Sequence, residues 1–360
     1  RRLGVRLILQ HGQKVGVLLK VLRQTWRKIH MPELTTGQAI REALSLCLDT
    51  NKTTFIAGED IGVYGGAFGV TDGLLEKYGE DRIKDTPISE DVIAGLAVGA
   101  AITGSMPIVE MQFSDFIVNA MDPIVNQAAK LHFMYGGAVN VPMIVRGASG
   151  AGTGAAAQHS QSLESWFCHV PGLKVVTPSN PQNAYDLLLA SFVDPNPIIF
   201  MEHKLIYKLK SEVILGALPS DSSALGKSKV VQEGTDITIA SYSNMVNTVM
   251  NVINNDFLKK YSIEVIDLLT LSPLDTETVI ASVEKTHNLL VCQEAPGSSS
   301  IGATLISEVA SSRAFTSLKK PPVLLSGLHS PMPSAKHLET TVIPQEEDIV
   351  IKIKEMIDNE

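Results

Sequence analysis

Apolar and polar residues along the chain form an alternating series of predicted helices and short buried strands. Residues 35–48 carry apolar side chains at helical spacing, and residues 53–58 form a short continuous apolar run typical of a strand. The same reasoning predicts further helices at residues 73–78, 91–103, 117–133, 162–168, 181–192, 244–257, 275–286, 301–310 and 346–356. It predicts further strands at residues 82–86, 107–113, 141–146, 173–177, 197–202, 236–241, 262–267, 288–293 and 323–325.

Short apolar strands that alternate with helices indicate parallel sheets covered by helices on both faces. The alternation lapses over residues 208–227, a looser stretch with Gly216, Pro219 and Gly226, and then resumes. We therefore expect an α/β protein with two doubly wound domains, residues 31–207 and 228–360, joined by a linker at residues 208–227.

The composition agrees with a two-domain globular chain. At 360 residues the chain is long for one ordinary domain, and a hydrophobic share of 44% with 19% charged residues allows a large core. No apolar run reaches the roughly 18–20 residues of a membrane span, so we expect no membrane association. The widely spaced Cys47, Cys168 and Cys292 suggest neither a disulfide framework nor a zinc site.

The charge is distributed unevenly along the chain. Residues 1–30 hold eight of the 30 Lys and Arg residues and no acid, which leaves 22 basic and 38 acidic residues after them. An acidic body is a poor match for nucleic acid. The basic leader fits a transit-type presequence, upstream sequence translated ahead of a start at Met31, or a docking arm, and we expect it to lie outside the fold.

Candidate chemistry lies where the predicted strands end. In open parallel sheets ligands gather at the carboxyl ends of the strands, a rule that selects Glu59, Glu90, residues 112–116 and the loop at residues 147–161. Each feature has an ordinary structural explanation by itself. Glu90, for example, could simply cap the helix that follows it.

The loop at residues 147–154 holds four glycines in eight residues and leads directly to His159. Such a loop lets the backbone approach another group closely. Its spacing fits neither a phosphate-binding loop, nor a dinucleotide fold, nor a nucleophile elbow. A histidine at this edge suits proton transfer, and metal ligation is not expected because no second His or Cys stands at ligand spacing.

Six motifs in register connect these residues to a known family. They are Gly-Glu-Asp at 58–60, Asp-Thr-Pro-Ile-Ser-Glu at 85–90, Asn-Gln-Ala-Ala-Lys at 126–130, Ala-Gln-His-Ser-Gln at 157–161, Pro-Gly-Leu-Lys-Val-Val-Thr-Pro at 171–178 and Ser-Pro-Leu-Asp at 272–275. Together they resemble the β subunits of 2-oxo acid dehydrogenase E1 components, from about residue 34 to about residue 351. The resemblance implies a pyrimidine-binding, transketolase-like domain followed by a transketolase C-terminal-type domain.

The resemblance also implies roles for the candidate residues. Glu90 takes the position of the glutamate that hydrogen-bonds the aminopyrimidine of thiamine diphosphate, which carries the carbon chemistry. Phe116 matches the aromatic residue that packs on the pyrimidine ring, with Gln112 nearby. His159 matches the histidine that serves proton transfer and reaction with the lipoyl group. Glu59 matches a buried acid that connects two active sites through shared protons.

The family further implies partners and ions. Its monovalent cation site, for an ion such as K⁺, is built from backbone carbonyls, and the matching positions are Met143, Ser191, Phe192, Asp194 and Asn196. Thiamine enzymes hold the diphosphate through Mg²⁺ and a Gly-Asp-Gly motif, which is absent from this sequence. The resemblance therefore implies a half-site completed by an α subunit in an α₂β₂ heterotetramer that serves a lipoyl-bearing E2 core.

The substrate and the compartment stay open at this point. Gln158 before His159 favours the pyruvate and acetoin branches over the branched-chain enzymes, and residues 65–71 and 134–137 lean towards acetoin-type sequences. We expect pyruvate. A split transketolase or a non-catalytic assembly subunit is the alternative reading. The location is expected to be cytoplasmic for a bacterial protein, or the mitochondrial matrix if residues 1–30 are a presequence.

Overall fold

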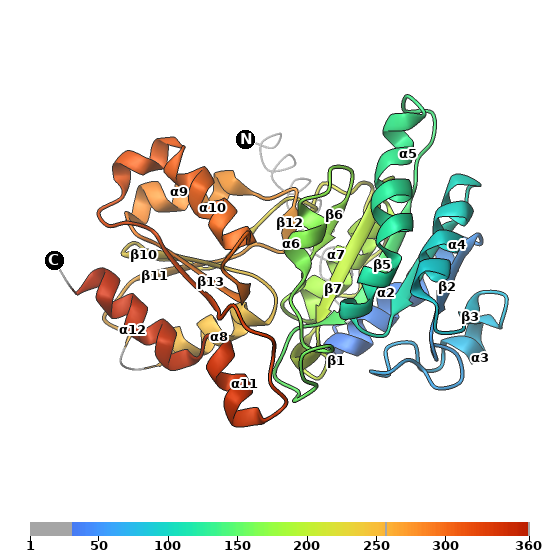
Figure 1. Ribbon diagram of the computed structural model, residues 1–360, viewed down its shortest axis with the longest axis horizontal. Helices are drawn as coiled ribbons and strands as arrows, with labels where there is room; N and C mark the ends of the chain where they lie inside the picture. Colours follow the sequence, from blue (N-terminus) through green and yellow to red (C-terminus); the bar gives the residue numbers. More distant parts are fainter. Residues whose placement is uncertain (1–30, 256–257, 359–360) are drawn as a thin grey trace, which may run out of the picture.

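The computed structural model describes residues 31–255 and 258–358, so the expectation for the basic leader lies outside the described residues. Two sheets stand side by side, each with helices on both faces (Figure 1). This is the α/β fold with two doubly wound domains that the sequence predicts. Among the helices of the described residues, none is long and apolar enough to cross a bilayer.

The first sheet has seven strands in the order β12-β6-β7-β5-β4-β2-β3. Its strands are β2 (Thr54–Gly58), β3 (Ile83–Asp85), β4 (Met106–Met111), β5 (Met143–Ser149), β6 (Lys174–Val176), β7 (Pro197–His203) and β12 (Thr270–Ser272). All neighbours pair in parallel except β12, which is antiparallel to β6. The associated helices are α2 (Thr36–Thr50), α3 (Leu74–Tyr78), α4 (Glu90–Ile102), α5 (Ala129–Met134), α6 (Glu164–Cys168) and α7 (Pro181–Phe192).

The second sheet has five strands in the order β14-β13-β10-β11-β9. Its strands are β9 (Lys229–Gln232), β10 (Ile237–Ser241), β11 (Ile263–Asp267), β13 (Leu289–Pro296) and β14 (Val323–Gly327), and only β9 pairs antiparallel. The helices here are α8 (Asn244–Ile253), α9 (Thr276–Thr286), α10 (Ile301–Ala310), α11 (Lys336–Val342) and α12 (Glu346–Ile357). In Figure 1, α9 and α10 cover one face and α8 and α12 the other.

The apolar core follows the alternation of side chains along each strand. Ile108 and Val109 are consecutive in β4, yet they belong to clusters on opposite faces, because successive strand side chains point to opposite sides. One cluster lies under α2 and α7. The cluster under α4 continues into the second sheet through residues such as Ile266 and Leu305. The two domains therefore share an uninterrupted apolar core.

The largest difference from the predicted elements is at residues 117–133. A continuous helix was expected, but the chain forms a 3₁₀ segment η1 (Ser114–Ala120), a π-helical segment η2 (Asp122–Ala128) and then α5. Pro123 lacks the N–H that a regular helix would use, so the hydrogen-bond pattern changes where η2 begins. The helix expected to run to residue 257 ends at Ile253, and Phe257 itself lies outside the described residues.

Short strands form in segments for which the sequence predicts no strand. The expected linker contains β8 (Lys210–Glu212), which pairs with β1 (Glu33–Thr35) at the start of the described chain. Thr270–Ser272 leaves the second domain and joins the first sheet as β12. The domain boundaries at residues 207 and 228 stay a prediction, although the chain plainly changes sheets in this region.

A buried ion cluster crosses the middle of the first sheet. Arg146 on β5 donates to Glu202 on β7 through Nε (2.6 Å) and Nη2 (2.9 Å), and to Glu110 on β4 through Nη1 (2.7 Å). The Arg146 side chain is only 1% exposed. Tyr207 adds a hydrogen bond from its hydroxyl to Glu202 Oε2 at 2.8 Å. Removing one member of such a cluster leaves the others buried and uncompensated.

We expect R146M to lower the free energy of unfolding by about 3–5 kcal/mol, because Glu110 and Glu202 would lose their cation while remaining buried. Urea denaturation measures the change. The matched control is R313M, which removes an exposed arginine that pairs with Glu277 and Glu284 and should change the free energy of unfolding much less than R146M does. Equal losses in the two variants would contradict the role assigned to the cluster.

Candidate active site

Glu59 and Glu90 are brought together by two loops that leave neighbouring strands. Glu59 follows β2, and Glu90 is the first residue of α4. The Thr86 amide donates to the Gly58 carbonyl at 2.9 Å, which ties the segment before Glu90 to the end of β2. The Gly62 amide donates to Asp85 Oδ1 at 2.7 Å, and a Cβ at Gly62 would lie 2.5 Å from Asp85 Oδ2. A glycine is needed for this approach.

Both carboxylates are buried, and the negative charge of Glu90 acts on Glu59. Their exposed fractions are 5% and 8%. Burial raises the pKa of Glu59 above its ordinary value, and repulsion from Glu90 and Asp60 raises that pKa further. Glu59 Oε1 is buried without a hydrogen-bond partner among the described residues. Glu59 therefore retains a proton more readily than an ordinary glutamate, and its Oε1 atom is available for a hydrogen bond.

Glu90 does not act as a simple helix cap. The N-cap residue Ser89 makes no side-chain cap bond, and Glu90 Oε2 accepts a hydrogen bond from Asn119 Nδ2 at 3.2 Å. Asn119 lies on η1, three residues after Phe116. This amide fixes one oxygen of the Glu90 carboxylate from a different element. The 3₁₀ geometry of η1 places the aromatic residue and the amide one turn apart on the same segment.

His159 packs against the aromatic residues of η1 and of the segment before it. Its ring lies edge-on to Phe116 at 5.2 Å and to Phe113 at 4.8 Å between centroids. Phe113 in turn contacts Phe68 edge-on at 5.7 Å, and Phe68 stacks on Tyr207 at 4.9 Å. Edge-to-face packing of this kind orients a ring without a hydrogen bond. The structure thus links His159 to Phe116, and through η1 to Asn119 and Glu90.

The remaining predicted residues fall in two places. Gln112 lies directly after β4 and is partly buried beside Phe113, so its cofactor role stays a prediction. The positions matched to a cation site gather at the opposite edge, where β5 and β7 begin and α7 ends. They are Met143, Ser191, Phe192, Asp194 and Asn196.

The side chains at this second edge are already engaged with one another. The Asp194 carboxylate pairs with Lys174, and its Oδ1 accepts hydrogen bonds from the Asn196 amide at 2.9 Å and from Asn196 Nδ2 at 2.8 Å. A site made of backbone carbonyls would be independent of these contacts. The cation site stays a prediction.

Three contacts of the site were not anticipated. Asn119 supports Glu90, Phe113 contacts His159, and Lys204 Nζ donates to the His159 carbonyl. Asn119 could have been found as the polar residue one 3₁₀ turn after Phe116. No local signal marks Lys204, because its partner lies 45 residues away along the chain.

The comparisons with known proteins agree with this architecture. The family "Transketolase, pyrimidine binding domain" matches residues 32–210, and the family "Transketolase, C-terminal domain" matches residues 226–349. A solved structure described as "Split gene transketolase, inactive beta4 tetramer" superimposes with a TM-score of 0.69, covering 90% of this chain and 99% of that chain. At 17% identity this likeness shows the fold alone. The fold and site therefore define a two-domain protein of the transketolase class.

Comparison with curated relatives shows which members of the transketolase class this chain resembles. The chain is 40% identical over 319 residues to "Pyruvate dehydrogenase E1 component subunit beta-1, mitochondrial" of Oryza sativa subsp. japonica, covering 88% of this chain and 85% of that protein. It is 39% identical over 324 residues to "Pyruvate dehydrogenase E1 component subunit beta" of Rickettsia conorii, covering 90% and 98%. The mitochondrial counterpart in Saccharomyces cerevisiae is 39% identical over 326 residues, covering 90% and 89%.

The chain belongs to the family of β subunits of 2-oxo acid dehydrogenase E1 components. The resemblance drawn from the six motifs is thereby confirmed.

We expect E59Q to become more stable relative to the unsubstituted chain as the pH rises. The folded chain holds a proton on Glu59 above the group's ordinary pKa of 4.5, so ionisation destabilises the folded state increasingly from that pH upwards. Glutamine cannot ionise and escapes this loss. Unfolding free energies measured between about pH 4 and pH 8 test the trend.

The control for this experiment is E277Q at the surface. The hydrogen bond from Arg313 lowers the pKa of Glu277. Protonation of Glu277 therefore affects the free energy of unfolding mainly below the ordinary pKa of 4.5. The E277Q difference should therefore stay flat over the range in which the E59Q difference grows. A flat E59Q difference would show that Glu59 titrates like an exposed carboxylate.

Proposed function

We propose that this chain is the pyrimidine-binding half of an E1 active site that decarboxylates a 2-oxo acid and passes the acyl group to a lipoyl-bearing E2. The substrate is pyruvate. The observation that carries the proposal is the convergence of buried Glu59 and Glu90 with Phe116 and His159 at one edge of the first sheet. Proton handling, aromatic packing and a fixed carboxylate are combined within one connected set of side chains.

The residues fit the aminopyrimidine end of thiamine diphosphate. Glu90 would hold the ring nitrogen, since Asn119 fixes only one oxygen of its carboxylate. Phe116 would pack against the ring, with Gln112 beside it, and Glu59 would offer its free buried oxygen. When bound, thiamine diphosphate supplies the nucleophilic carbon and the electron sink for decarboxylation. In this proposal Glu59 shares protons with a second active site of the assembly, which suits its raised pKa.

His159 would act in the transfer to the lipoyl group. Pyruvate loses CO₂, and its remaining two carbons are oxidised to the acyl level as the lipoyl disulfide takes up two electrons. One sulfur then carries the acyl group, and the other takes up one proton. We assign the delivery of that proton to His159, which the two phenyl rings orient and Lys204 holds at its backbone carbonyl.

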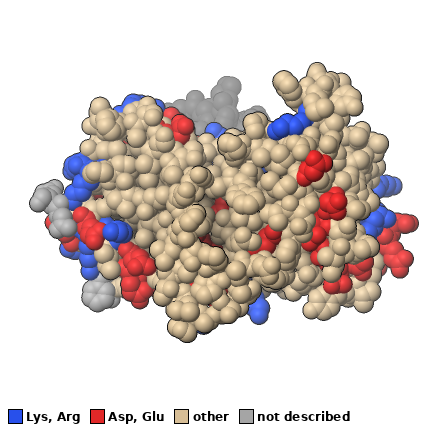
Figure 2. Space-filling view, in the orientation of Figure 1, with Lys and Arg blue, Asp and Glu red and all other residues tan. Residues whose placement is uncertain are grey.

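A partner subunit would complete the site. The sequence contains no Gly-Asp-Gly motif, so we assign the diphosphate and Mg²⁺ to an α subunit in an α₂β₂ heterotetramer. Figure 2 shows few charged side chains over the middle of the face it presents. Large apolar side chains are exposed at Phe133 and Tyr135, at the end of α5, and at Trp166 on α6. Such side chains suit burial against a partner.

The relatives favour pyruvate over the other substrates considered. Those named above are pyruvate dehydrogenase subunits at 39–40% identity over most of the chain, whereas the split transketolase shares only 17%. A purely structural subunit would not need a buried, proton-retaining Glu59 beside Glu90. These points support E1 catalysis over a split transketolase and over an assembly role.

Reconstitution tests the proposed function directly. The chain alone should show no turnover, and with its α partner, thiamine diphosphate and Mg²⁺ it should decarboxylate pyruvate and acylate lipoamide. Acetoin, a branched 2-oxo acid and a sugar phosphate serve as competing substrates. Strong turnover by the isolated chain would contradict the half-site, and turnover of the sugar phosphate without lipoamide would identify a split transketolase.

We expect E90Q to slow the exchange of the thiazolium C2 proton in the heterotetramer by at least about 100-fold, because glutamine cannot shift a proton at the pyrimidine nitrogen. Exchange into deuterated water measures the rate. The control D91N removes the adjacent exposed carboxylate in the same helical turn and should leave exchange unchanged. An E90Q enzyme with normal exchange would remove Glu90 from the proposed mechanism.

A further inference from the structure

The loop that carries His159 is closed at its base, and one of its flanks lines a cavity. The Gly150 amide donates to the Gln161 carbonyl at 3.1 Å, which joins the two ends of the loop. On one flank, Ala157, Ser160 and Gln161 line a cavity of about 320 Å³ rather than packed side chains. Apolar packing therefore does not fix this flank. Polar contacts of the backbone hold the loop instead.

Two carboxylates of the C-terminal domain hold the backbone of the loop. Glu294 on β13 accepts a hydrogen bond from the Ala151 amide at 2.6 Å through Oε1. Glu339 on α11 accepts from the Gly152 amide at 2.7 Å through Oε1 and from the Gly154 amide at 3.1 Å through Oε2. Glu339 is 1% exposed. Three of four successive residues of the loop thus donate to the other domain.

The glycines of the loop make this contact possible. Gly150 and Gly152 have φ angles of +82° and +97°, a region that favours glycine. A Cβ at Gly150 would overlap the ring of His203, and a Cβ at Gly152 would lie 2.6 Å from Leu205 Cδ1. The close approach expected of this loop is therefore made to His203, Leu205 and the two carboxylates.

Titratable side chains of both domains surround the contact between the loop and the C-terminal domain. His203 Nε2 lies 2.8 Å from Glu294 Oε2. Burial acts to raise the pKa of Glu294, but the contacts with His203, the Ala151 amide and Ser162 hold that pKa below its ordinary value. Burial holds the pKa of Lys204 below its ordinary value, although the nearby carboxylates of Asp115, Glu294 and Glu339 act to raise it. Lys204 lies among these acids and donates to the His159 carbonyl.

We propose that Glu339 is a positioning residue that holds the His159 loop from the C-terminal domain and thereby sets the place of His159 for transfer to the lipoyl group. Glu294 anchors the start of the same loop. The inference rests on the proposed role of His159. It assigns to the C-terminal domain a part in catalysis at a distance, since Glu339 contacts the loop backbone and not the histidine ring.

The test uses the full heterotetramer with E339A and E339Q. With lipoyl-E2 as acceptor, E339A should lower kcat by about tenfold or more, the scale of losing hydrogen bonds to a charged group. Turnover with an artificial electron acceptor, which bypasses the lipoyl step, should change by less than about threefold. E339Q keeps an accepting oxygen and should fall between E339A and the unsubstituted enzyme. A loss of folding would lower both activities together.

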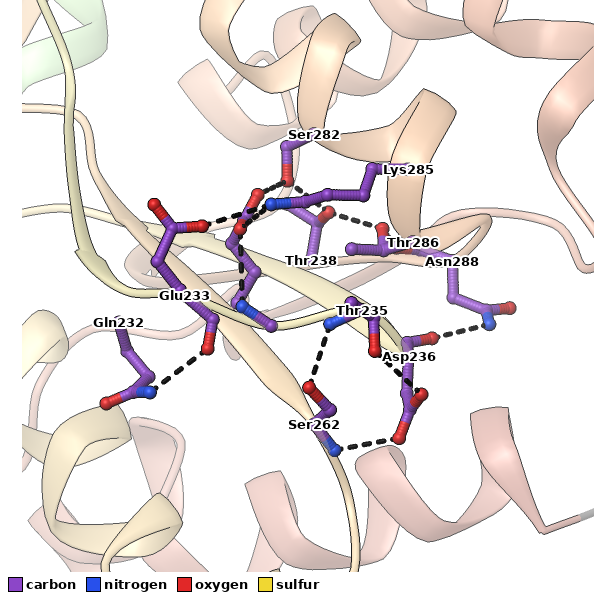
Figure 3. Close-up of polar contacts among 12 residues, drawn as sticks. Gln232, Glu233, Thr235, Asp236, Thr238, Ser262, Ser282, Lys285, Thr286 and Asn288 are labelled. Atoms are coloured by element: carbon purple, nitrogen blue, oxygen red, sulfur yellow. Dashed lines mark hydrogen bonds and ion pairs between the residues drawn. The ribbon is translucent and has the colours of Figure 1, made fainter.

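Hydrogen exchange supplies a second readout that needs no turnover. The amides of Gly152 and Gly154 should exchange about tenfold faster in E339A, because Glu339 is their acceptor, whereas the Ala151 amide donates to Glu294 and should keep its rate. The matched control is E264Q. Glu264 is a buried carboxylate of the same domain that also accepts from a glycine amide, that of Gly234 at 3.3 Å, and its partners Ser282 and Lys285 appear in Figure 3. This network does not contact the loop, so E264Q should leave both readouts unchanged.

The outcomes separate the inference from the proposed function. H159A should abolish acylation of lipoyl-E2 and spare turnover with the artificial acceptor. If H159A leaves acylation intact, the proposed role of His159 fails, and Glu339 has no catalytic loop to position. If H159A acts as expected but E339A changes neither the acceptor ratio nor the exchange of the Gly152 and Gly154 amides, the positioning role is wrong. An equal response in E264Q would also overturn it.

Discussion

The contact of Arg146 with Glu110 and Glu202 is the interaction on which the candidate site depends. It joins three adjacent strands, β4, β5 and β7, below the edge where the site lies. One guanidinium faces two carboxylates, and burial, with the charge of Glu202, raises the pKa of Glu110 even though Arg146 opposes the shift. Tyr207 hydrogen-bonds Glu202 and stacks on Phe68, which leads through Phe113 to the His159 ring. A buried charge cluster thus supports the aromatic surface that orients the histidine.

The second constraint is that the two domains do not fold around separate interiors. They share one apolar cluster, and β12 crosses into the first sheet. Polar contacts follow the same seam: the Tyr242 hydroxyl donates to Glu164 Oε1 at 2.6 Å, and Ser179 donates to Asp267. Glu294 and Glu339 continue this seam to the glycine-rich loop. Because apolar burial and buried hydrogen bonds act together here, displacement of one domain would disturb the loop at the active edge.

Local pattern was sufficient to predict most elements and the two-sheet architecture, since strand and helix periodicities are properties of neighbouring residues. It failed at residues 117–133. There Pro123 interrupts the hydrogen-bond pattern, and the chain forms 3₁₀ and π segments in place of one regular helix. The motifs and the family resemblance predicted Glu59, Glu90, Phe116 and His159, which the structure connects. They could not predict Lys204 or Glu339, because such contacts join residues far apart in sequence and leave no periodic signal. Asn119 was missed although it stands only one 3₁₀ turn after Phe116.

The distribution of unsatisfied polar atoms bears on the proposed half-site. Buried polar groups are normally hydrogen-bonded, and leaving one unpaired costs about 1–3 kcal/mol. Several of the buried side-chain oxygens that lack a partner among the described residues lie on the segments that build the site: Glu59 Oε1, Thr86 Oγ1, Ser114 Oγ, Asp115 Oδ2 and Ser160 Oγ. The other six such atoms lie elsewhere in the described residues, so this cost is not confined to the site. In the proposed function, the five atoms on the site segments would bind groups of a cofactor and of a partner subunit, and that binding would stabilise the folded chain.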